Sequence, residues 1–466
     1  MKTKFFKPTQ FHYSMFNNNG ELLVLNTFTG KLYKVHSKNA KVVSSILQHK
    51  RIDENEIPLH SLIAEKLLVP DNADEYAYYR SSCSGTIHQP DLGLTVLPTH
   101  QCNCRCVYCY ENFNSDIMSR LVQSNLVEFV KNEISRCTSL SIAWFGGEPL
   151  LAMSVIEDLS NHFIDLCRIR KKQYGASITT NGTLLTLETF RILQKCRVYT
   201  YQITIDGTKE VHDAQRPLTT GKSSYDLIID NLLKIKQTIR VNSFKVFLRI
   251  NLTKSSLDSI DEYIKTIEGL FGDDPRFIIH FNVAGNWGGS RIGEFLDELL
   301  TQSDNVSDKI KCSLDKLSYI LPTQNIDKSY WGSFHFSPGC DVGFSRHFTI
   351  DTDGKVFKCA QTIRDHIPAI GNFGVSPLEW DEYEYSKWMH LAGDDSVPEE
   401  CQKCHLLPTG CYQDHNCIVA RYKSKYTEET QTSVTKCQRS KTKTENYMQE
   451  LDRNKQYIQL EGGVFS

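Results

Sequence analysis

Apolar and polar positions alternate in two rhythms along the middle of the chain. Short apolar runs, typical of strands, are each followed by longer amphipathic runs, typical of helices. The expected strands cover residues 92–98, 140–145, 176–180, 198–205, 244–252 and 277–283. The expected helices cover residues 121–134, 154–168, 187–195, 224–236 and 257–270. This order predicts an α/β fold, a partial (β/α)6 barrel of parallel strands over residues 92–283.

The beginning of the chain has a different pattern. Three strand-like runs are separated by turn sequences and followed by two expected helices, the first capped by Ser37. These elements cover residues 11–16, 21–26, 31–36, 38–49 and 59–68. They predict an N-terminal winged-helix-like module over residues 1–85, and the polar residues 71–89 are expected to form a linker. Acidic residues near its end oppose DNA binding, so we expect a peptide-binding or purely structural module.

The loop after the first barrel strand carries three cysteines, Cys102, Cys106 and Cys109, spaced C-x3-C-x2-C. In a parallel barrel, side chains that do chemistry collect at the carboxyl ends of the strands, where this loop begins. Three thiolates on one tight loop would leave the fourth corner of an iron–sulfur cube without a protein ligand. A zinc knuckle formed by Cys106 and Cys109, or a set of buried thiols, is the alternative.

The second strand ends in Gly146-Gly147-Glu148-Pro149. Two glycines allow the backbone to approach a ligand closely, and the glutamate can accept a hydrogen bond from an ammonium group. Taken alone the motif is a strand-ending turn. Its position beside the cysteine loop favours a ligand-binding role.

A second group of cysteines follows a bridging segment over residues 284–335 and lies in a cysteine-rich region over residues 336–466, which is expected to end in a helix. A hairpin turn at residues 351–354 would carry Cys359 back beside Cys340. The group contains seven cysteines, too many for one tetrahedral site and one short of two: Cys340, Cys359, Cys401, Cys404, Cys411, Cys417 and Cys437. Zinc at Cys401 and Cys404 is the alternative to iron–sulfur clusters.

Composition narrows the class of protein. The chain has 466 residues, 40% of them hydrophobic, and a formal net charge of −2. This charge gives no general attraction to nucleic acid or to an anionic membrane. There is no apolar run near 18 residues and no apolar core for a signal peptide at the start, so we expect a cytoplasmic protein. A reducing cytosol keeps thiols available for metals.

With these motifs in this order, the chain resembles the radical S-adenosylmethionine (SAM) enzymes of the SPASM subfamily, of the peptide-maturase type that modifies ribosomally synthesised peptides. The resemblance covers roughly residues 92–440. It rests on the cysteine loop, on Gly-Gly-Glu-Pro, on the cysteine-rich tail, and on the stretches at residues 180–185 and 205–213 with Arg216.

The resemblance implies a [4Fe–4S] cluster held by Cys102, Cys106 and Cys109, whose open iron binds SAM. Cys104 is not a family ligand. The implied SAM contacts are Tyr108 beside the adenine, Gly146, Gly147 and Glu148 at the methionine end, Thr204 and Arg216. An arginine suits the SAM carboxylate because it is always charged and can bond in two places.

The resemblance also implies a SPASM domain with two auxiliary [4Fe–4S] clusters. Cys340, Cys359 and Cys417 would hold the first, and Cys401, Cys404, Cys411 and Cys437 the second. Many relatives have another cysteine shortly before the position of Cys340, where this chain has Phe334 and His335. The first auxiliary cluster would therefore have an open iron, or would use His335 or Cys312.

The implied activity is cleavage of SAM to a 5′-deoxyadenosyl radical that takes a hydrogen atom from a precursor peptide, leading to a thioether or C–C side-chain cross-link. The implied partners are a precursor whose leader binds the N-terminal module, and an electron donor such as flavodoxin or ferredoxin. One alternative is an anaerobic sulfatase-maturing enzyme that makes formylglycine, although Ala360 stands where that group has an aspartate. A non-catalytic iron–sulfur electron carrier is the other.

Overall fold

The computed structural model divides into two compact units. The terminal unit contains residues 1–89, 331–345 and 386–466, and the sheet unit contains residues 90–330 and 346–385. The structure describes residues 4–56, 60–111, 113, 116–286, 292–300, 306–317, 340–364, 367–375, 378–392, 399–407, 418–427, 444–445, 447–449, 451–453 and 455–460. In these ranges, no helix is long and apolar enough to cross a membrane.

The sheet unit is built on six parallel strands that are neighbours in chain order. They are β7 (Asp91–Val96), β8 (Ser139–Trp144), β9 (Gln173–Thr180), β10 (Val198–Thr204), β11 (Lys245–Leu252) and β12 (Phe277–Val283). All six confirm strands expected from the sequence. Because each crossover contains a helix, the strands can pair in parallel, as the alternating pattern predicted.

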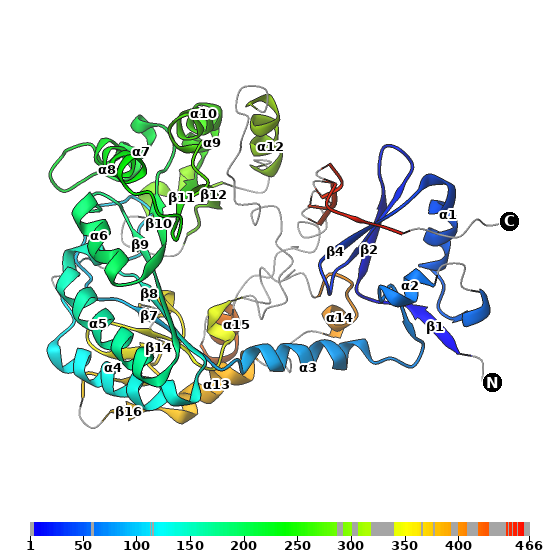
Figure 1. Cartoon of the computed structure of the whole chain (residues 1–466), viewed down its shortest axis with the longest axis horizontal. Coiled ribbons are helices and arrows are strands. Elements are labelled where there is room, and N and C mark those ends of the chain that lie inside the picture. The colour runs from blue at the N-terminus through cyan, green and yellow to red at the C-terminus, as the bar shows by residue number, and fades with distance from the viewer. Residues whose placement is uncertain are drawn as a thin grey trace. The chain divides into compact units, whose positions relative to one another are not determined.

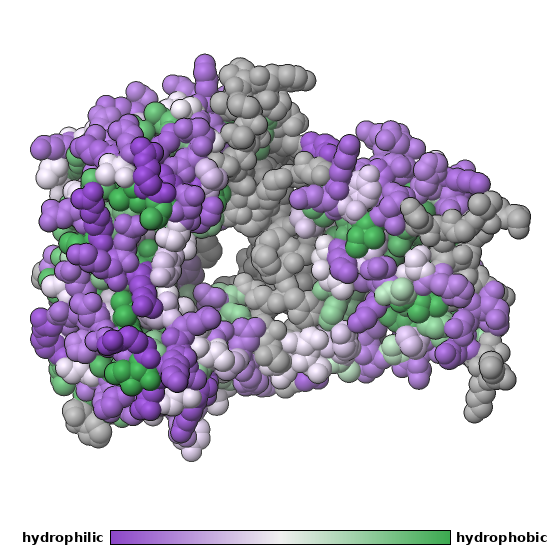
Figure 2. Space-filling view, viewed as in Figure 1, coloured by the Kyte–Doolittle hydropathy of each residue, from purple (hydrophilic) through white to green (hydrophobic). Residues whose placement is uncertain are grey.

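Helices cover one face of this sheet (Figure 1). They are α4 (Arg120–Glu133), α5 (Met153–Arg170), α6 (Leu187–Lys195), α7 (Lys209–Gln215), α8 (Ser224–Thr238), α9 (Lys254–Asp258) and α10 (Ile260–Phe271). Their apolar sides face the sheet, while mainly hydrophilic side chains lie on the outward surface (Figure 2). The short helix α7 was not predicted, because the Asp206 to Arg216 stretch lacks a helical apolar repeat.

The sheet continues beyond β7 with four strands from the cysteine-rich region. β13 (His347–Ile350) runs parallel to β7 and antiparallel to β14 (Lys355–Phe357), and two short strands, β15 (Gly371–Asn372) and β16 (Glu379–Trp380), follow. The predicted turn at residues 351–354 is confirmed. Gly354 has a φ of +89°, and a Cβ there would meet the Gly374 backbone, so the turn requires glycine.

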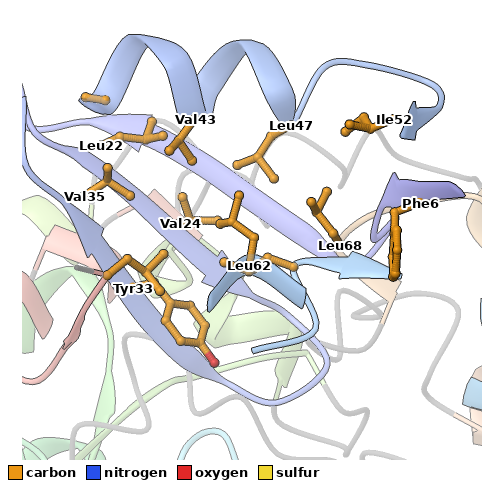
Figure 3. Packing of buried hydrophobic residues seen from close by; sticks show 13 residues of the cluster. Phe6, Leu22, Val24, Tyr33, Val35, Val43, Leu47, Ile52, Leu62 and Leu68 are labelled. Carbon is orange, nitrogen blue, oxygen red and sulfur yellow. The ribbon is translucent and has the colours of Figure 1, made fainter. Parts of the chain in front are cut away.

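The terminal unit contains the three strands expected at the start of the chain. β2 (His12–Phe16), β3 (Leu22–Asn26) and β4 (Lys31–Val35) form an antiparallel sheet, and β17 (Ile458–Gln459) pairs with β4 in parallel. The helix α1 (Ser37–Ile46) packs on this sheet through Val43, beside Leu22 and Val35 (Figure 3). The pattern therefore located this small core correctly.

Two predictions about the helices of this unit were wrong. The side chain of His36, not Ser37, caps α1 by accepting a hydrogen bond from the Lys38 N–H. The second helix is a single turn, α2 (Ser61–Ala64), because the chain then enters β6 (Leu68–Pro70). β6 pairs with β1 (Phe5–Pro8), which also pairs with β5 (Ile52–Asp53).

The expected linker is instead the helix α3 (Glu75–Ile87). Its Tyr79 packs with Phe11 and Leu407 in a buried cluster, and its Glu75 carboxylate accepts a hydrogen bond from the Gln10 N–H at 2.9 Å. These contacts with distant residues order a polar segment whose own composition predicts no helix.

The remaining helices are short. They are η1 (Glu54–Glu56), η2 (Ile134–Arg136), η3 (Pro149–Ala152), α11 (Ile292–Phe295), η4 (Leu296–Glu298), α12 (Val306–Leu317), η7 (Asp341–Gly343), η8 (Ala360–Ile363), α13 (Glu382–Ala392), α14 (Glu399–Gln402) and α15 (Ile418–Tyr426).

Candidate functional site

The cysteine loop leaves the carboxyl end of β7 and folds back on itself. Cys102, Cys106 and Cys109 lie in one cluster with Cys104, Tyr108 and Leu218. The Arg105 N–H donates to the Pro217 carbonyl at 2.8 Å, and the Val107 N–H donates to the Gln215 carbonyl at 2.9 Å. The end of α7 and the segment that follows it therefore hold the loop from one side, where the three thiols lie together.

Cys104 lies inside this loop and is 1% exposed. Its thiol hydrogen-bonds both Cys102 and Cys106, and these bonds lower the pKa of both neighbours, that of Cys106 to about 7. The Arg216 guanidinium also lowers the pKa of Cys106, whereas burial raises it. A thiolate is the metal-binding form of cysteine, so the surroundings of Cys106 suit a metal ligand.

The Gly-Gly-Glu-Pro turn packs directly on the backbone of the cysteine loop. Gly146 has a φ of +110°, and a Cβ at Gly147 would lie 2.6 Å from the His100 carbonyl oxygen. The Gly147 N–H donates to the Thr99 carbonyl at 3.2 Å, and the Glu148 N–H donates to the Gln101 carbonyl at 2.7 Å. Both glycines are needed because side chains would push the two segments apart.

The Glu148 carboxylate is fully buried and accepts three hydrogen bonds. They come from the Thr180 hydroxyl at 2.7 Å, the Asn181 N–H at 2.8 Å and the Leu150 N–H at 3.0 Å. Burial raises the pKa of Glu148, and these bonds lower it in part. A carboxylate has about four acceptor positions, so one remains for a further donor. Glu148 thus ties the ends of β8 and β9 together.

Tyr108 connects the cysteine loop to the ends of β10 and β11. Its hydroxyl donates to the Asp206 carboxylate and accepts hydrogen bonds from Arg216 Nη1 at 2.7 Å and from Asn251 Nδ2 at 3.1 Å. Asp206 is fully buried and also accepts from the Asn251 N–H at 2.7 Å. Burial raises the pKa of Asp206, and the Arg216 guanidinium opposes this.

The other predicted SAM contacts lie in the same region. Thr204 ends β10 and is buried, and Arg216 follows α7 and is 7% exposed. Within the described part of the chain, Arg216 Nε has no hydrogen-bond partner. A buried guanidinium with a spare donor suits a carboxylate ligand.

Several residues of this region were not predicted from the sequence. Asn251 is a polar residue near the end of an apolar strand, and Arg249, two positions earlier on the same strand face, donates to it at 3.0 Å. These two polar residues in an otherwise apolar run were the sequence feature that could have identified them as part of the site. His212, in contrast, is a scaffolding residue, because its Nδ1 accepts a hydrogen bond from the Asp206 N–H at 3.0 Å.

A buried charged group joins the cysteine loop to the hairpin that leads to Cys359. His100 Nε2 lies 2.6 Å from Asp351 Oδ1, and His100 Nδ1 lies 3.7 Å from Glu111 Oε2. Arg364 Nη2 lies 3.4 Å from the same glutamate oxygen. Burial lowers the pKa of His100, but its interactions with the Asp351 and Glu111 carboxylates outweigh the effect of burial and raise the pKa to about 9.

The structure gives only part of the second cysteine group. Cys340, Cys359, Cys401 and Cys404 are described, whereas Phe334, His335, Cys411, Cys417 and Cys437 lie outside the described residues. Cys312, the distant alternative, is exposed on α12. Among the described residues, no group of three or more His, Cys, Asp or Glu side chains could hold a metal ion in the arrangement seen. The auxiliary clusters therefore remain predictions.

Comparisons with known proteins agree on the sheet unit. Residues 96–267 match the profile of the Radical SAM superfamily. The radical SAM cyclopropyl synthase TigE of Paramaledivibacter caminithermalis is 25% identical over 367 residues, which are 71% of this chain and 72% of TigE. The cysteine-type anaerobic sulfatase-maturating enzyme of Clostridium novyi is 28% identical over 183 residues, which are 37% of this chain and 48% of that enzyme.

Among solved structures, anSMEcpe with bound AdoMet aligns with a TM-score of 0.58 at 20% identity, over 78% of this chain and 96% of its own. At this identity the alignment establishes a shared fold and nothing finer. Together with the superfamily match, it accounts for the parallel sheet. Residues 96–267 therefore form a domain of the Radical SAM superfamily, whose members are enzymes.

Proposed function

We propose that the protein modifies a ribosomally made precursor peptide by forming a bond between side-chain atoms. The observation that carries this proposal is the likeness to TigE, which extends over 367 residues and so reaches well beyond the radical SAM domain. A cyclopropane ring is closed by a new C–C bond. The likeness therefore favours a C–C bond over a thioether as the product.

The residues of the cysteine loop fit the role proposed for them. A [4Fe–4S] cluster would be held by Cys102, Cys106 and Cys109, since their thiols lie together. The hydrogen bond from Cys104 and the nearby Arg216 guanidinium favour the thiolate form of Cys106. When bound, the cluster and SAM together would supply a 5′-deoxyadenosyl radical that abstracts a hydrogen atom. The chain's own part is to bind SAM, to orient it and to exclude water.

The proposed SAM contacts divide this work among three elements. Gly146 and Gly147 let the turn after β8 lie against the cysteine loop. Arg216, buried and with an unpartnered Nε among the described residues, would bind the SAM carboxylate. Tyr108 would lie beside the adenine, oriented through its hydroxyl, while Thr204 and Glu148 would complete the site.

Two auxiliary [4Fe–4S] clusters in the cysteine-rich region form the second part of the proposal, with the cysteine sets given by the SPASM resemblance. The buried His100–Asp351 pair supports it in one respect, because it would hold the hairpin that leads to Cys359 at a fixed position relative to the cysteine loop. A flavodoxin or ferredoxin would supply electrons.

A peptide substrate would bind partly through the N-terminal strands, which could take an extended leader segment as an added strand. The test is co-expression with each short open reading frame beside the gene, followed by mass spectrometry of the peptide. Each cross-link should remove two hydrogen atoms from the peptide mass. An unchanged mass for every such peptide would count against the proposal.

Sulfatase maturation is the second candidate, and the likeness to the Clostridium novyi enzyme favours it. It would convert one cysteine or serine of a sulfatase peptide to formylglycine. Ala360, directly after Cys359, speaks against it, because an alanine side chain cannot act as a base. A sulfatase-derived peptide incubated with the reconstituted enzyme, SAM and a reductant decides the point: an aldehyde in the product would establish this second function.

A further inference from the structure

The N-terminal sheet is completed by the other end of the chain. The described residues of 444–453 are helical, and Met448 packs in a buried cluster with Leu23, Leu25 and Leu32. Lys34 Nζ lies 2.9 Å from Asp452 Oδ1 and 2.7 Å from Glu21 Oε2. The C-terminal helical segment is thus anchored on one face of the sheet, opposite the face covered by α1.

Beyond this anchor, the chain forms β17, the red arrow in Figure 1, which pairs with the outer edge of β4. Ile458 pairs with Tyr33 and Gln459 pairs with Lys34, in parallel. The Leu460 N–H then donates to the Lys34 carbonyl at 2.9 Å. The edge of β4 therefore accepts an extended peptide segment, since its backbone groups face the tail.

Leu460 provides the apolar part of this contact. It is 4% exposed and belongs to the same buried cluster as Tyr33 and Val35. Ile458 is 39% exposed, and Gln459 is exposed as well. The tail thus binds by two strand pairings and a single buried aliphatic side chain, far less than holds the helical segment before it.

We propose that the outer edge of β4 and the Leu460 site form a peptide-binding site, which residues 458–460 occupy and which an extended segment of the substrate peptide takes over by displacing them. The matching segment would pair with Tyr33 and Lys34 and place an aliphatic side chain where Leu460 lies. This inference rests on the proposed peptide-modifying function, and it adds the place of binding and a competing segment of the enzyme itself.

The tail lowers the apparent affinity for any external strand, because a peptide binds only the fraction of molecules whose edge is free. If the tail leaves the edge for a tenth to a hundredth of the time, releasing it should raise the affinity about 10- to 100-fold. The tether makes the tail an effective competitor, since its local concentration exceeds that of a free peptide.

The probe is a fluorescent synthetic peptide with the sequence of residues 455–462, and the readout is its anisotropy with the full-length protein. Leu460→Asp removes the buried anchor, and Gln459→Asp makes a similar change at the adjacent exposed position. We expect the probe to bind Leu460→Asp at least about tenfold more tightly than wild type, and Gln459→Asp like wild type. A probe with aspartate at the Leu460 position should not bind.

Equal affinity for wild type and Leu460→Asp, or no binding to either, would overturn the proposal. So would a wild-type dimer that Leu460→Asp converts to a monomer, because the tail would then pair with a second copy. Leu460→Ala serves as a milder variant if the aspartate disturbs folding. SAM cleavage without peptide should be the same in all variants, so a failure here is distinguishable from a failure of the proposed function.

Discussion

Replacing Asp351 by asparagine should destabilise the sheet unit in a pH-dependent way. The side chains of His100, Asp351 and Glu111 are each about one-tenth exposed, so the ion pair is poorly screened by water. The pKa of His100 is raised from its usual 6.5 to about 9, against the effect of burial, by its interactions with the Asp351 and Glu111 carboxylates. A shift of this size corresponds to about 3 kcal/mol of folding free energy.

The sign of the pH dependence of stability follows from the direction of the pKa shift of His100. A raised pKa means that the folded state binds the proton more tightly, so the stabilisation is fully present below pH 6.5 and is lost as the pH rises through 9. At pH 6, Asp351→Asn should lower the free energy of unfolding by about 3 kcal/mol. Above pH 9, where His100 is neutral, the loss should fall to about 1 kcal/mol, the value of an ordinary hydrogen bond.

The assay is urea unfolding of the iron-free, reduced protein, followed by circular dichroism at pH 6, 7.5 and 9.5. Asp353→Asn is the matched control, because Asp353 lies in the same turn but its side chain is 48% exposed. It should change stability by less than about 0.5 kcal/mol. A loss for Asp351→Asn that is the same at all three pH values, or an equal loss for the control, would refute the role given to the buried pair.

Two further substitutions test the candidate site. Gly147→Ala places a Cβ 2.6 Å from the His100 carbonyl oxygen and should lower the amount of iron bound per chain after reconstitution. Gly269→Ala is the control, because its Cβ meets nothing within 4 Å. It should leave the iron content unchanged and stabilise α10 by up to about 1 kcal/mol. Equal iron in both variants would contradict the packing argument. Tyr108→Phe removes the hydroxyl that hydrogen-bonds with Asp206, Arg216 and Asn251. It should weaken SAM binding, measured by calorimetry, about tenfold, or about 1.4 kcal/mol, and leave the iron content unchanged. Wild-type affinity for SAM would exclude a positioning role for the hydroxyl.

The sequence was most informative where structure follows from local periodicity. The six parallel strands, the hairpin at residues 351–354 and the three N-terminal strands each depend on neighbours a few positions away, and each was found. The cysteine loop and Gly-Gly-Glu-Pro were also visible, because they follow consecutive predicted strands, whose carboxyl ends lie at one edge of a parallel sheet.

Long-range pairs were not visible. His100 and Asp351 are 251 positions apart, and nothing near either residue identifies the other as its partner. The helix α3 was interpreted as a linker because its ordering contacts come from Phe11 and Leu407. The two residues of β17 are too few to produce a strand pattern, and only the fold reveals that they close the edge of β4.

Formation of 5′-deoxyadenosine tests the central claim most directly. The wild-type protein would be reconstituted anaerobically with iron and sulfide and incubated with SAM and a strong reductant, beside Cys106→Ala and the control Cys167→Ala, which removes a buried thiol on α5. The account predicts 5′-deoxyadenosine from the wild type and from Cys167→Ala, and none from Cys106→Ala. Product from Cys106→Ala at the wild-type rate, or no product from a wild-type protein that binds both iron and SAM, would contradict it.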